Sequence, residues 1–370
     1  MAFFGGPKTE SFLGVDIGAG GLKVVELSGQ KGRATLLTYG YSVRKPGEAI
    51  VSPFDDPRGT GEQLAKICQR AGVKTTRAMA ALPLSSVFSA IISVPRRKDE
   101  KEMKPLIDAA VSKLTPLPLA EMITYSTFID DIGKGEKDAK AAKETKGEKG
   151  PKPSDYVRVL VTGAAKTLIQ KYIDIFKVAK LELMAIDTEA FALIRSLVGK
   201  DRAAILILDL GSMRTNITVV EKGIPFLTRS INVGGSSLTR RLREQMNVTE
   251  NEAEEMKFDL AASLEADPSA PIPPALEATL QPILNEVQYA FKLYAQMDVA
   301  EAKRVEKVIV TGGSSLLPRV PEYLAEKLNL NVYRGNPWAR VVYPQDLRPV
   351  LEEIGPRMSV AIGLAMREIE

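Results

Sequence analysis

Near the start of the chain, hydrophobic residues gather in short runs with few polar positions, and glycines separate these runs. Residues 14–17, 22–27 and 34–41 form three such runs, and glycine-bearing turns join them. Strands that follow one another through tight turns pair in antiparallel fashion. The pattern therefore predicts a three-stranded antiparallel meander.

Farther along, segments with helical spacing alternate with short apolar runs. The spacing predicts helices over residues 61–71, 98–113, 168–179, 188–197, 236–246, 249–260, 275–297, 320–328 and 356–367. The apolar runs predict strands over residues 78–83, 87–94, 122–129, 157–165, 181–186, 203–210, 216–220, 225–231, 307–311 and 331–334. This mixture is typical of an α/β fold.

One segment does not fit either pattern. Residues 133–155 consist mainly of Lys, Glu, Ala, Gly and Pro and have almost nothing to bury. We expect a disordered or flexible loop there, with its charges solvated.

The opening pattern occurs a second time near the middle of the chain. The apolar run 203–210 carries Asp209 near its end, Gly211 turns the chain, and two further strand-like runs follow at 216–220 and 225–231. We interpret this as two similar halves that close on a cleft.

The composition limits the possible chemistry. The chain has 370 residues, of which 45% are hydrophobic and 26% charged, as in soluble globular proteins long enough for two domains. The net charge of +4 comes largely from the lysine-rich segment, so we do not expect nucleic-acid binding. We find no signal peptide and no apolar run as long as a membrane span, and we expect a cytoplasmic protein. The single cysteine and the absence of histidine exclude disulfides within the chain, histidine-based catalytic triads and histidine metal sites.

Three separated motifs could bind a nucleotide. They comprise Asp16, Gly18, Ala19, Gly20, Gly21 and Lys23; Asp209, Gly211, Ser212 and Thr215; and Gly312, Gly313 and Ser314. An acid at a strand end can hold a hydrated Mg²⁺ through water, and glycine loops let main-chain N–H groups approach a phosphate. We add Gly234, Gly235 and Thr239, where a predicted helix begins. For metal binding the candidates are Asp16 and Asp209.

Each motif also has a purely structural interpretation. The first could be a glycine hairpin with a surface lysine, Asp209 could cap a turn, and Gly312 and Gly313 could serve a packed strand–helix junction. The combination of the three, in this order, favours a ligand.

In this order the motifs resemble the phosphate-1, phosphate-2 and adenosine motifs of the actin–Hsp70–hexokinase superfamily. Within it the chain is most similar to the PilM family of type IV pilus assembly, which is itself similar to the division protein FtsA. This likeness rests on Phe12 to Gly18, Leu22 to Leu27, Ala80 to Pro83, Ile186 to Leu193, Asp209 to Gly211, Gly234 to Thr239, Thr311 to Gly313, Gly335 to Trp338 and Val360 to Arg367.

The resemblance implies a two-lobed actin-like ATPase fold, with duplicated ribonuclease-H-like lobes and an FtsA-type inserted subdomain. It implies subdomain 1A at 11–85, 185–200 and 355–370, the insertion 1C at 86–184, subdomain 2A at 201–240 and 305–354, and 2B at 241–304. ATP and Mg²⁺ would lie between the lobes. The implied partner is the N-terminal cytoplasmic tail of a PilN-like inner-membrane protein, with other pilus platform components or self-association as further possibilities. The protein would lie at the inner membrane through such partners.

The sequence also departs from the family pattern. Ala19, Gly20 and Gly21 stand where related proteins often have serines, so phosphate would be held by main chain and Lys23. The second loop carries a bulky Arg214. Asp187 and Glu189 are candidates for a general base only because of their position in the sequence. We therefore assign no catalytic residue and expect ATP binding with at most weak ATPase activity. A sugar-kinase-like phosphotransferase and an FtsA-like division protein are the alternatives, although the chain ends without the amphipathic membrane tail of FtsA.

Overall fold

The computed structural model describes residues 10–30, 33–44, 51–97, 99–129, 156–266, 271–317 and 319–369. These form two compact units: a larger one from residues 1–85 and 170–370, and a smaller one from residues 86–169. The predicted loop at 133–155 lies outside the described residues. Within the described ranges, no helix has both the length and the apolar composition that a membrane span requires.

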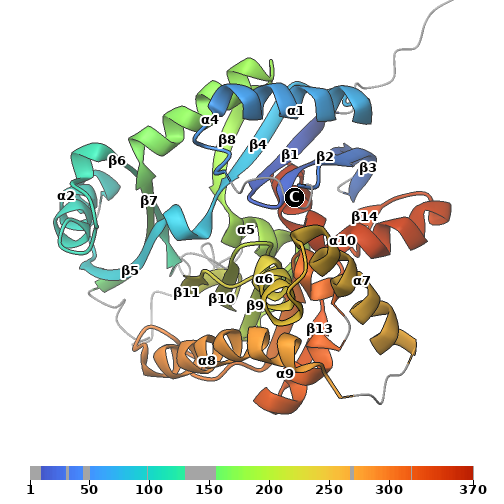
Figure 1. The fold of residues 1–370 in the computed structure, drawn as a ribbon. Helices are drawn as coiled ribbons and strands as arrows, with labels where there is room; N and C mark the ends of the chain where they lie inside the picture. The colour runs from blue at the N-terminus through green and yellow to red at the C-terminus, as the bar shows by residue number, and fades with distance from the viewer. Residues whose placement is uncertain are drawn as a thin grey trace, which may run out of the picture. The chain divides into compact units, whose positions relative to one another are not determined.

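The larger unit contains two sheets (Figure 1). Five strands of each follow the same order, and β14 is added at one edge of the first. The first sheet runs β14-β3-β2-β1-β4-β8 and consists of β1 (Ser11–Gly18), β2 (Gly21–Gln30), β3 (Arg33–Tyr41), β4 (Arg77–Leu82), β8 (Glu182–Thr188) and β14 (Val341–Val342). The second runs β11-β10-β9-β12-β13 and consists of β9 (Ile205–Leu210), β10 (Thr215–Glu221), β11 (Ile224–Ile231), β12 (Lys307–Thr311) and β13 (Asn331–Arg334).

In each sheet a three-stranded antiparallel meander is followed by two parallel strands. This confirms both the predicted meander at the start of the chain and its repetition near the middle. We call the first sheet with its helices the first lobe, and the second sheet with its helices the second lobe.

Helices cover both faces of the first sheet. Helices α1 (Pro57–Ala71) and α4 (Lys166–Val178) touch each other where Gly61 lies against Ile175 and Val178, and α1 packs on β2 and β3. The opposite face packs against α10 (Arg348–Ala365). Next to α10 lies α5 (Glu189–Leu193), which continues as one π-helical turn, η4 (Ile194–Val198).

In the second lobe the long helix α8 packs on β10 and β11, and α9 packs on β13. The helices of this lobe are α6 (Gly235–Met246), α7 (Glu250–Ala266), α8 (Pro274–Gln296) and α9 (Val320–Leu328). The short helical turns η5 (Gly313–Leu316) and η6 (Gln345–Leu347) complete the larger unit.

A single apolar core joins the two lobes. It combines Phe12 and Met79 of the first sheet with Ile205 and Ile309 of the second, and α5, η4 and α10 contribute the side chains between them. Because the alternate residues of a strand share one face, the position after Phe12 and Gly14 on that face is Asp16, and the position after Ile205 and Ile207 is Asp209. Both acids therefore emerge at the end of a strand whose apolar positions face the same central helices.

The approach of α10 is unusually close. A Cβ atom at Gly14 would overlap the carbonyl oxygen of Ala361 in α10, and one at Gly363 would overlap the carbonyl oxygen of Ala192 in α5. Only glycine leaves room for such contacts between backbones. These two positions fix α10 against β1 and α5.

The smaller unit is a three-stranded antiparallel sheet with one helix. It consists of β5 (Phe88–Pro95), α2 (Glu100–Val111), β6 (Met122–Phe128) and β7 (Tyr156–Ala165), preceded by η1 (Leu84–Ser86), with η2 (Leu119–Glu121) before β6. Alternate positions of β7, namely Val157, Val159 and Val161, pack against Met103 and Ile107 of α2. The unit thus has its own small core.

The last helix is longer than its sequence predicts. It begins at Arg348 rather than at residue 356, with Pro349 in its first turn and Pro356 inside it. Proline is favourable in the first turn but normally interrupts a helix interior, so the pattern around Pro356 gave the wrong start. The predicted insertion 86–184 extends beyond the smaller unit, which ends at residue 169 and leaves most of α4 and all of β8 in the larger one. The division into subdomains 1A, 1C, 2A and 2B stays a prediction.

Candidate functional site

The first predicted loop is a tight hairpin between β1 and β2. Asp16 pairs across the strands with Lys23, whose Nζ lies 3.0 Å from the carboxylate, and Gly18 pairs with Gly21. The Lys23 ammonium also lies over Gly18, so its charge is directed toward the loop rather than into solvent. Among the described residues, no acceptor is found for the main-chain N–H groups of Ala19 and Gly20 at the tip. Such groups are available to an anion.

The second loop follows β9 and lies next to the first. Gly20 faces Ser212, with 3.0 Å between the Ser212 Cβ and a Cβ placed on Gly20. Gly211 closes its own turn by donating to the carbonyl of Arg214 at 2.9 Å. In the described part of the chain the N–H groups of Ser212 and Met213 have no acceptor, as in the first loop. Two pairs of unpaired donors therefore come from opposite lobes.

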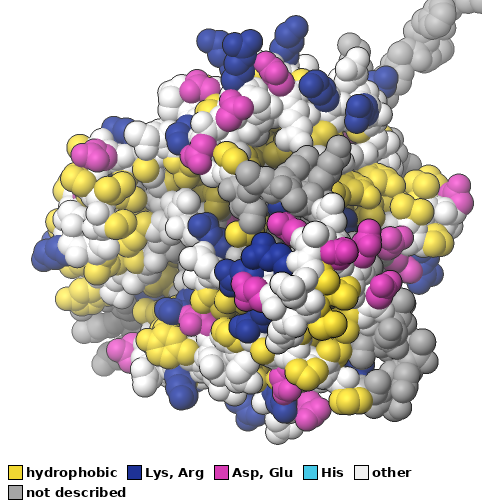
Figure 2. All heavy atoms as spheres, in the orientation of Figure 1, with side chains coloured by type: hydrophobic (Ala, Val, Ile, Leu, Met, Phe, Trp, Pro, Cys, Tyr) yellow, Lys and Arg dark blue, Asp and Glu magenta, His cyan; other side chains and the backbone are white. Residues whose placement is uncertain are grey.

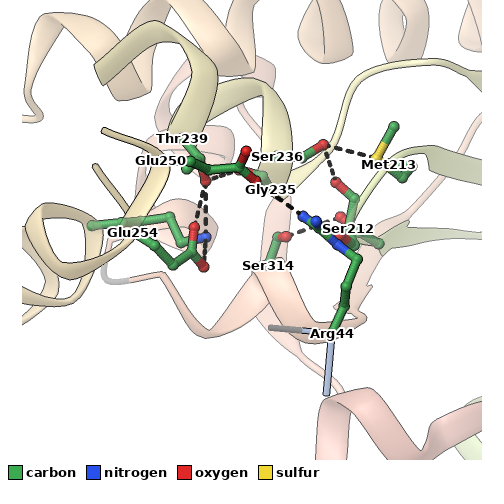
Figure 3. Close-up of polar contacts among 11 residues, drawn as sticks. Arg44, Ser212, Met213, Gly235, Ser236, Thr239, Glu250, Glu254 and Ser314 are labelled. Carbon is green, nitrogen blue, oxygen red and sulfur yellow. Dashed lines mark hydrogen bonds and ion pairs between the residues drawn. The ribbon is translucent and has the colours of Figure 1, made fainter. Parts of the chain in front are cut away.

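The carbonyl oxygen of Gly211 links two further predicted motifs to this loop. It accepts the N–H of Gly235 at 3.0 Å and the hydroxyl of Ser314 at 2.9 Å. Ser236 continues the contact, because both its N–H and its hydroxyl donate to the carbonyl of Ser212, and Figure 3 shows these groups converging. Gly234 is packed against the same loop at Gly211 and Ser212. The beginning of α6 and the beginning of η5 thus meet at the second loop.

Gly312 lies beside Asp209. Its φ is +85°, and a Cβ there would overlap the Asp209 carboxylate, so both the backbone conformation and the available space require glycine. Its N–H donates to the carbonyl of Pro356 in α10 at 3.0 Å. The next residue, Gly313, has open space where a side chain would be. The third motif therefore borders the acid at the end of β9.

Two predicted residues use their hydroxyls inside the protein. Thr215 is fully buried and donates to the carbonyl of Val233 at 2.7 Å. Thr239 is also buried and donates to Glu254 of α7 at 2.6 Å. The structure therefore places both beside the loops, with their side-chain hydrogen bonds already made.

Two groups near the loops have roles that the sequence left open. Arg214 is exposed, donates to Asn232 at 3.0 Å and also contacts the hydroxyl of Ser85 in the first lobe. Asp187 forms an ion pair with Arg195 of η4. Of the two carboxylates named as bases, Asp187 is thus already engaged.

Glu189 lies with the strand-end acids. Its Oε2 accepts the main-chain N–H of Leu84 from the first lobe at 2.8 Å and the amide of Asn216 from the second at 3.1 Å. Asn216 also lies 3.4 Å from the Asp209 carboxylate. Burial, together with Asp209 and Asp16, raises the pKa of Glu189 to about 8, and burial and Asp16 raise the pKa of Asp209 to about 6.

Sequence reasoning missed Asn216, although it is the second residue of β10 and lies directly opposite Asp209. Cross-strand pairing with Asp209 is the signal that could have identified it.

Comparison with known proteins agrees with this arrangement. The model of the family "Type IV pilus assembly protein PilM" matches residues 145–369, which is more than half of the chain. A solved "PilM-PilN type IV pilus biogenesis complex" is similar over 98% of this chain and 100% of that one, with a TM-score of 0.77 and 22% identity.

Two other structures share the fold at lower identity. The ethanolamine utilization protein EutJ of Carboxydothermus hydrogenoformans has a TM-score of 0.54 at 17% identity, over 97% of this chain and 90% of that one. MreB 5 of Spiroplasma citri, bound to AMPPNP, has a TM-score of 0.51 at 14% identity, over 96% and 95%. The duplicated sheets and converging loops define an actin-like protein. The chain belongs to the PilM family of type IV pilus assembly proteins.

The raised pKa of Glu189 predicts a pH-dependent stability. A carboxyl group whose pKa is about 8 in the folded chain and near 4.5 when unfolded favours folding below pH 4.5, and this contribution is lost as the pH rises toward 8. Glu189→Gln keeps a neutral acceptor for Leu84 and Asn216. We expect the free energy of unfolding of the variant to rise relative to the unaltered protein between pH 5 and 8, by at most about 1.4 kcal/mol per pH unit. Urea unfolding across this range measures the difference, and parallel curves would contradict the assignment.

Proposed function

We propose that this chain binds Mg–ATP between its two lobes and acts as a nucleotide-binding scaffold in type IV pilus assembly. The observation that supports this best is that the two loops meet at Gly20 and Ser212, beside the strand-end acids. Among the described residues the N–H groups of Ala19, Gly20, Ser212 and Met213 on these loops have no acceptor. Donors from two facing loops suit a phosphate chain held from both sides. MreB 5, which shares the fold, was solved with bound AMPPNP, and this supports a nucleotide as the ligand.

The donor set fits Mg²⁺ that is bound together with phosphates. No group of three or more candidate ligands is placed to hold a metal within the described residues, and Asp16 and Asp209 are the two acids at the loops. Mg²⁺ retains several waters and typically takes one or two carboxylates plus substrate phosphates. We propose that Asp16 and Asp209 bind it through water and that Lys23 adds positive charge toward the phosphates. When bound, the ion would neutralise phosphate charge.

The rest of the nucleotide would lie toward the second lobe. Gly234, Gly235 and Ser314 contact the carbonyl of Gly211, and Gly312 lies beside Asp209 and Leu210. Together with Gly313 they give a backbone-lined approach for the base and ribose. Gly313 is open to such an approach because nothing lies where its side chain would be. Thr239, held by Glu254, supports α6 at this end of the site.

The electrostatics favour binding over hydrolysis. With a pKa of about 8 before a cation binds, Glu189 is mostly protonated near neutral pH, so only a minor fraction of it is ready to accept a proton from water. This is consistent with at most weak ATPase activity. Asp187 is no alternative base, since it is paired with Arg195.

We propose further that the protein binds the N-terminal cytoplasmic tail of a PilN-like protein and thereby stays at the cytoplasmic face of the inner membrane. Support comes from membership of the PilM family and from the likeness to the PilM–PilN complex. Both favour pilus assembly over the division-protein and sugar-kinase alternatives. Other platform components and self-association stay further possibilities.

The nucleotide proposal predicts a specific loss on removing a strand-end charge. We expect Asp209→Asn, and separately Asp16→Asn, to weaken Mg–ATP binding roughly 10-fold at pH 7.5, because a charged partner of the hydrated metal is lost. Isothermal titration calorimetry with and without EDTA measures this. Glu62→Gln on the exposed side of α1 is the matched control and should bind as the unaltered chain does. Equal affinity in all four proteins would contradict the site.

The partner proposal predicts saturable binding of a peptide. A fluorescent peptide from the cytoplasmic N-terminus of the cognate PilN-like protein should bind in fluorescence polarisation, and a scrambled peptide of the same composition should not. The titration is run with Mg–ATP and without nucleotide. Absence of saturable binding in both states would contradict the partner while leaving the nucleotide proposal standing.

A further inference from the structure

An ion pair joins the two lobes across the candidate nucleotide site. Arg44 follows strand β3 in the first lobe, and Glu250 is the first residue of α7 in the second. Their Nη2 and Oε1 atoms are 3.5 Å apart, and the side chains are 20% and 34% exposed (Figure 3). The two residues are 206 positions apart in sequence. The pair therefore depends on how the lobes are arranged.

The first-lobe end of the pair is attached to the phosphate loop. The main-chain N–H of Arg44 donates to the carbonyl of Gly20 at 3.4 Å, and that of Ser42 donates to Leu22 at 2.8 Å. A movement of the Arg44 backbone would therefore displace the tip of the hairpin, where Gly20 faces Ser212.

The second-lobe end is attached to the beginning of α6. One turn after Glu250, Glu254 accepts the hydroxyl of Thr239 at 2.6 Å, and the same hydroxyl oxygen lies 3.3 Å from the carbonyl of Gly235. Lys257 pairs with Glu254 and holds this connection. Each residue of the ion pair is thus connected, through hydrogen bonds of its own segment, to a loop that we propose to contact the nucleotide.

Several other charges gather around the pair. In Figure 2 basic and acidic side chains cluster over α6 and α7, which present the exposed Arg240 and Arg243 and the exposed Glu252 and Glu255. Glu250 is the α7 carboxylate that reaches Arg44 in the first lobe. It thereby connects α7 to the first lobe.

We propose that Arg44 and Glu250 form a latch over the bound nucleotide, which must open for the nucleotide to leave. The inference rests on the proposed nucleotide site. The shared core around α5, η4 and α10 holds the lobes together at one place, so opening of the cleft separates groups on the two lobes that lie away from that core. Breaking the pair lowers the barrier to opening and speeds release. The pair is partly exposed, so its contribution is modest and decreases with salt.

The experiment compares release rates in a double-mutant cycle. Arg44→Met, Glu250→Gln and the double variant are loaded with a fluorescent ATP analogue and Mg²⁺, and dissociation is followed by stopped-flow fluorescence after a chase with excess ATP. We expect each single variant to release the analogue roughly 2–5-fold faster. The double variant should be no faster than the faster single one, since both remove the same interaction. Raising the salt concentration should speed release from the unaltered protein and leave the variants little changed.

The matched control is the exposed pair of Arg58 and Glu62 on α1, which lies within one helix and joins no loops. Arg58→Met should release the analogue at the unaltered rate, and thermal unfolding of every variant confirms that it is folded.

Glu250→Gln distinguishes the latch from a direct role of Arg44 in phosphate binding. If Arg44 were a phosphate ligand with which Glu250 competes, Glu250→Gln would slow release while Arg44→Met would speed it. That result would overturn the latch, and so would equal rates in all variants that still bind the analogue. Failure of the unaltered chain to bind the analogue at all would overturn the latch together with the nucleotide proposal.

Discussion

The close packing of helix α10 against β1 and α5 is the constraint on which the rest of the larger unit depends. Backbone meets backbone at Gly14 and Gly363, and neither position has room for a Cβ atom. The same helix supplies the Pro356 carbonyl that accepts the N–H of Gly312. A change in the position of α10 would therefore move the end of β1 and the third motif together. The shared core makes this coupling stiff, since well-packed interiors resist small displacements.

Acidic groups lie close together at the site. Burial, Asp209 and Asp16 raise the pKa of Glu189, burial and Asp16 raise that of Asp209, and Lys23 is paired with Asp16. The raised pKa values of Glu189 and Asp209 show that ionising these groups costs free energy in this arrangement. Such unfavourable electrostatics are typical of functional sites and would be relieved by a bound cation. The protein loses some stability at the place where we propose that it holds Mg–ATP.

Much of the fold follows from the sequence because the signal is local and repeated. The runs that carry Asp16 and Asp209 near their ends are apolar, and the glycine turns that follow them reverse the chain. The contacts that complete the site are not local. Glu189 contacts Leu84, which is 105 positions away in sequence, and Arg44 contacts Glu250, which is 206 positions away. No local sequence pattern therefore indicates these pairs. The hydrogen bond that the Thr215 hydroxyl donates to the carbonyl of Val233 likewise depends on tertiary packing. The predicted start of the last helix was wrong because of Pro356. The helix continues through this proline because burial stabilises its neighbours in α10.

The central claim is that one ligand is held by the main chain of both lobes at once. Amide hydrogen exchange at short labelling times, with and without Mg–ATP, tests it most directly, because the N–H groups of Ala19, Gly20, Ser212 and Met213 have no acceptor among the described residues. We expect peptides covering residues 18–22 and 211–214 to become protected together, at the same nucleotide concentration, while strands β5 and β7 do not change. Protection of one loop without the other, or of neither, would contradict it.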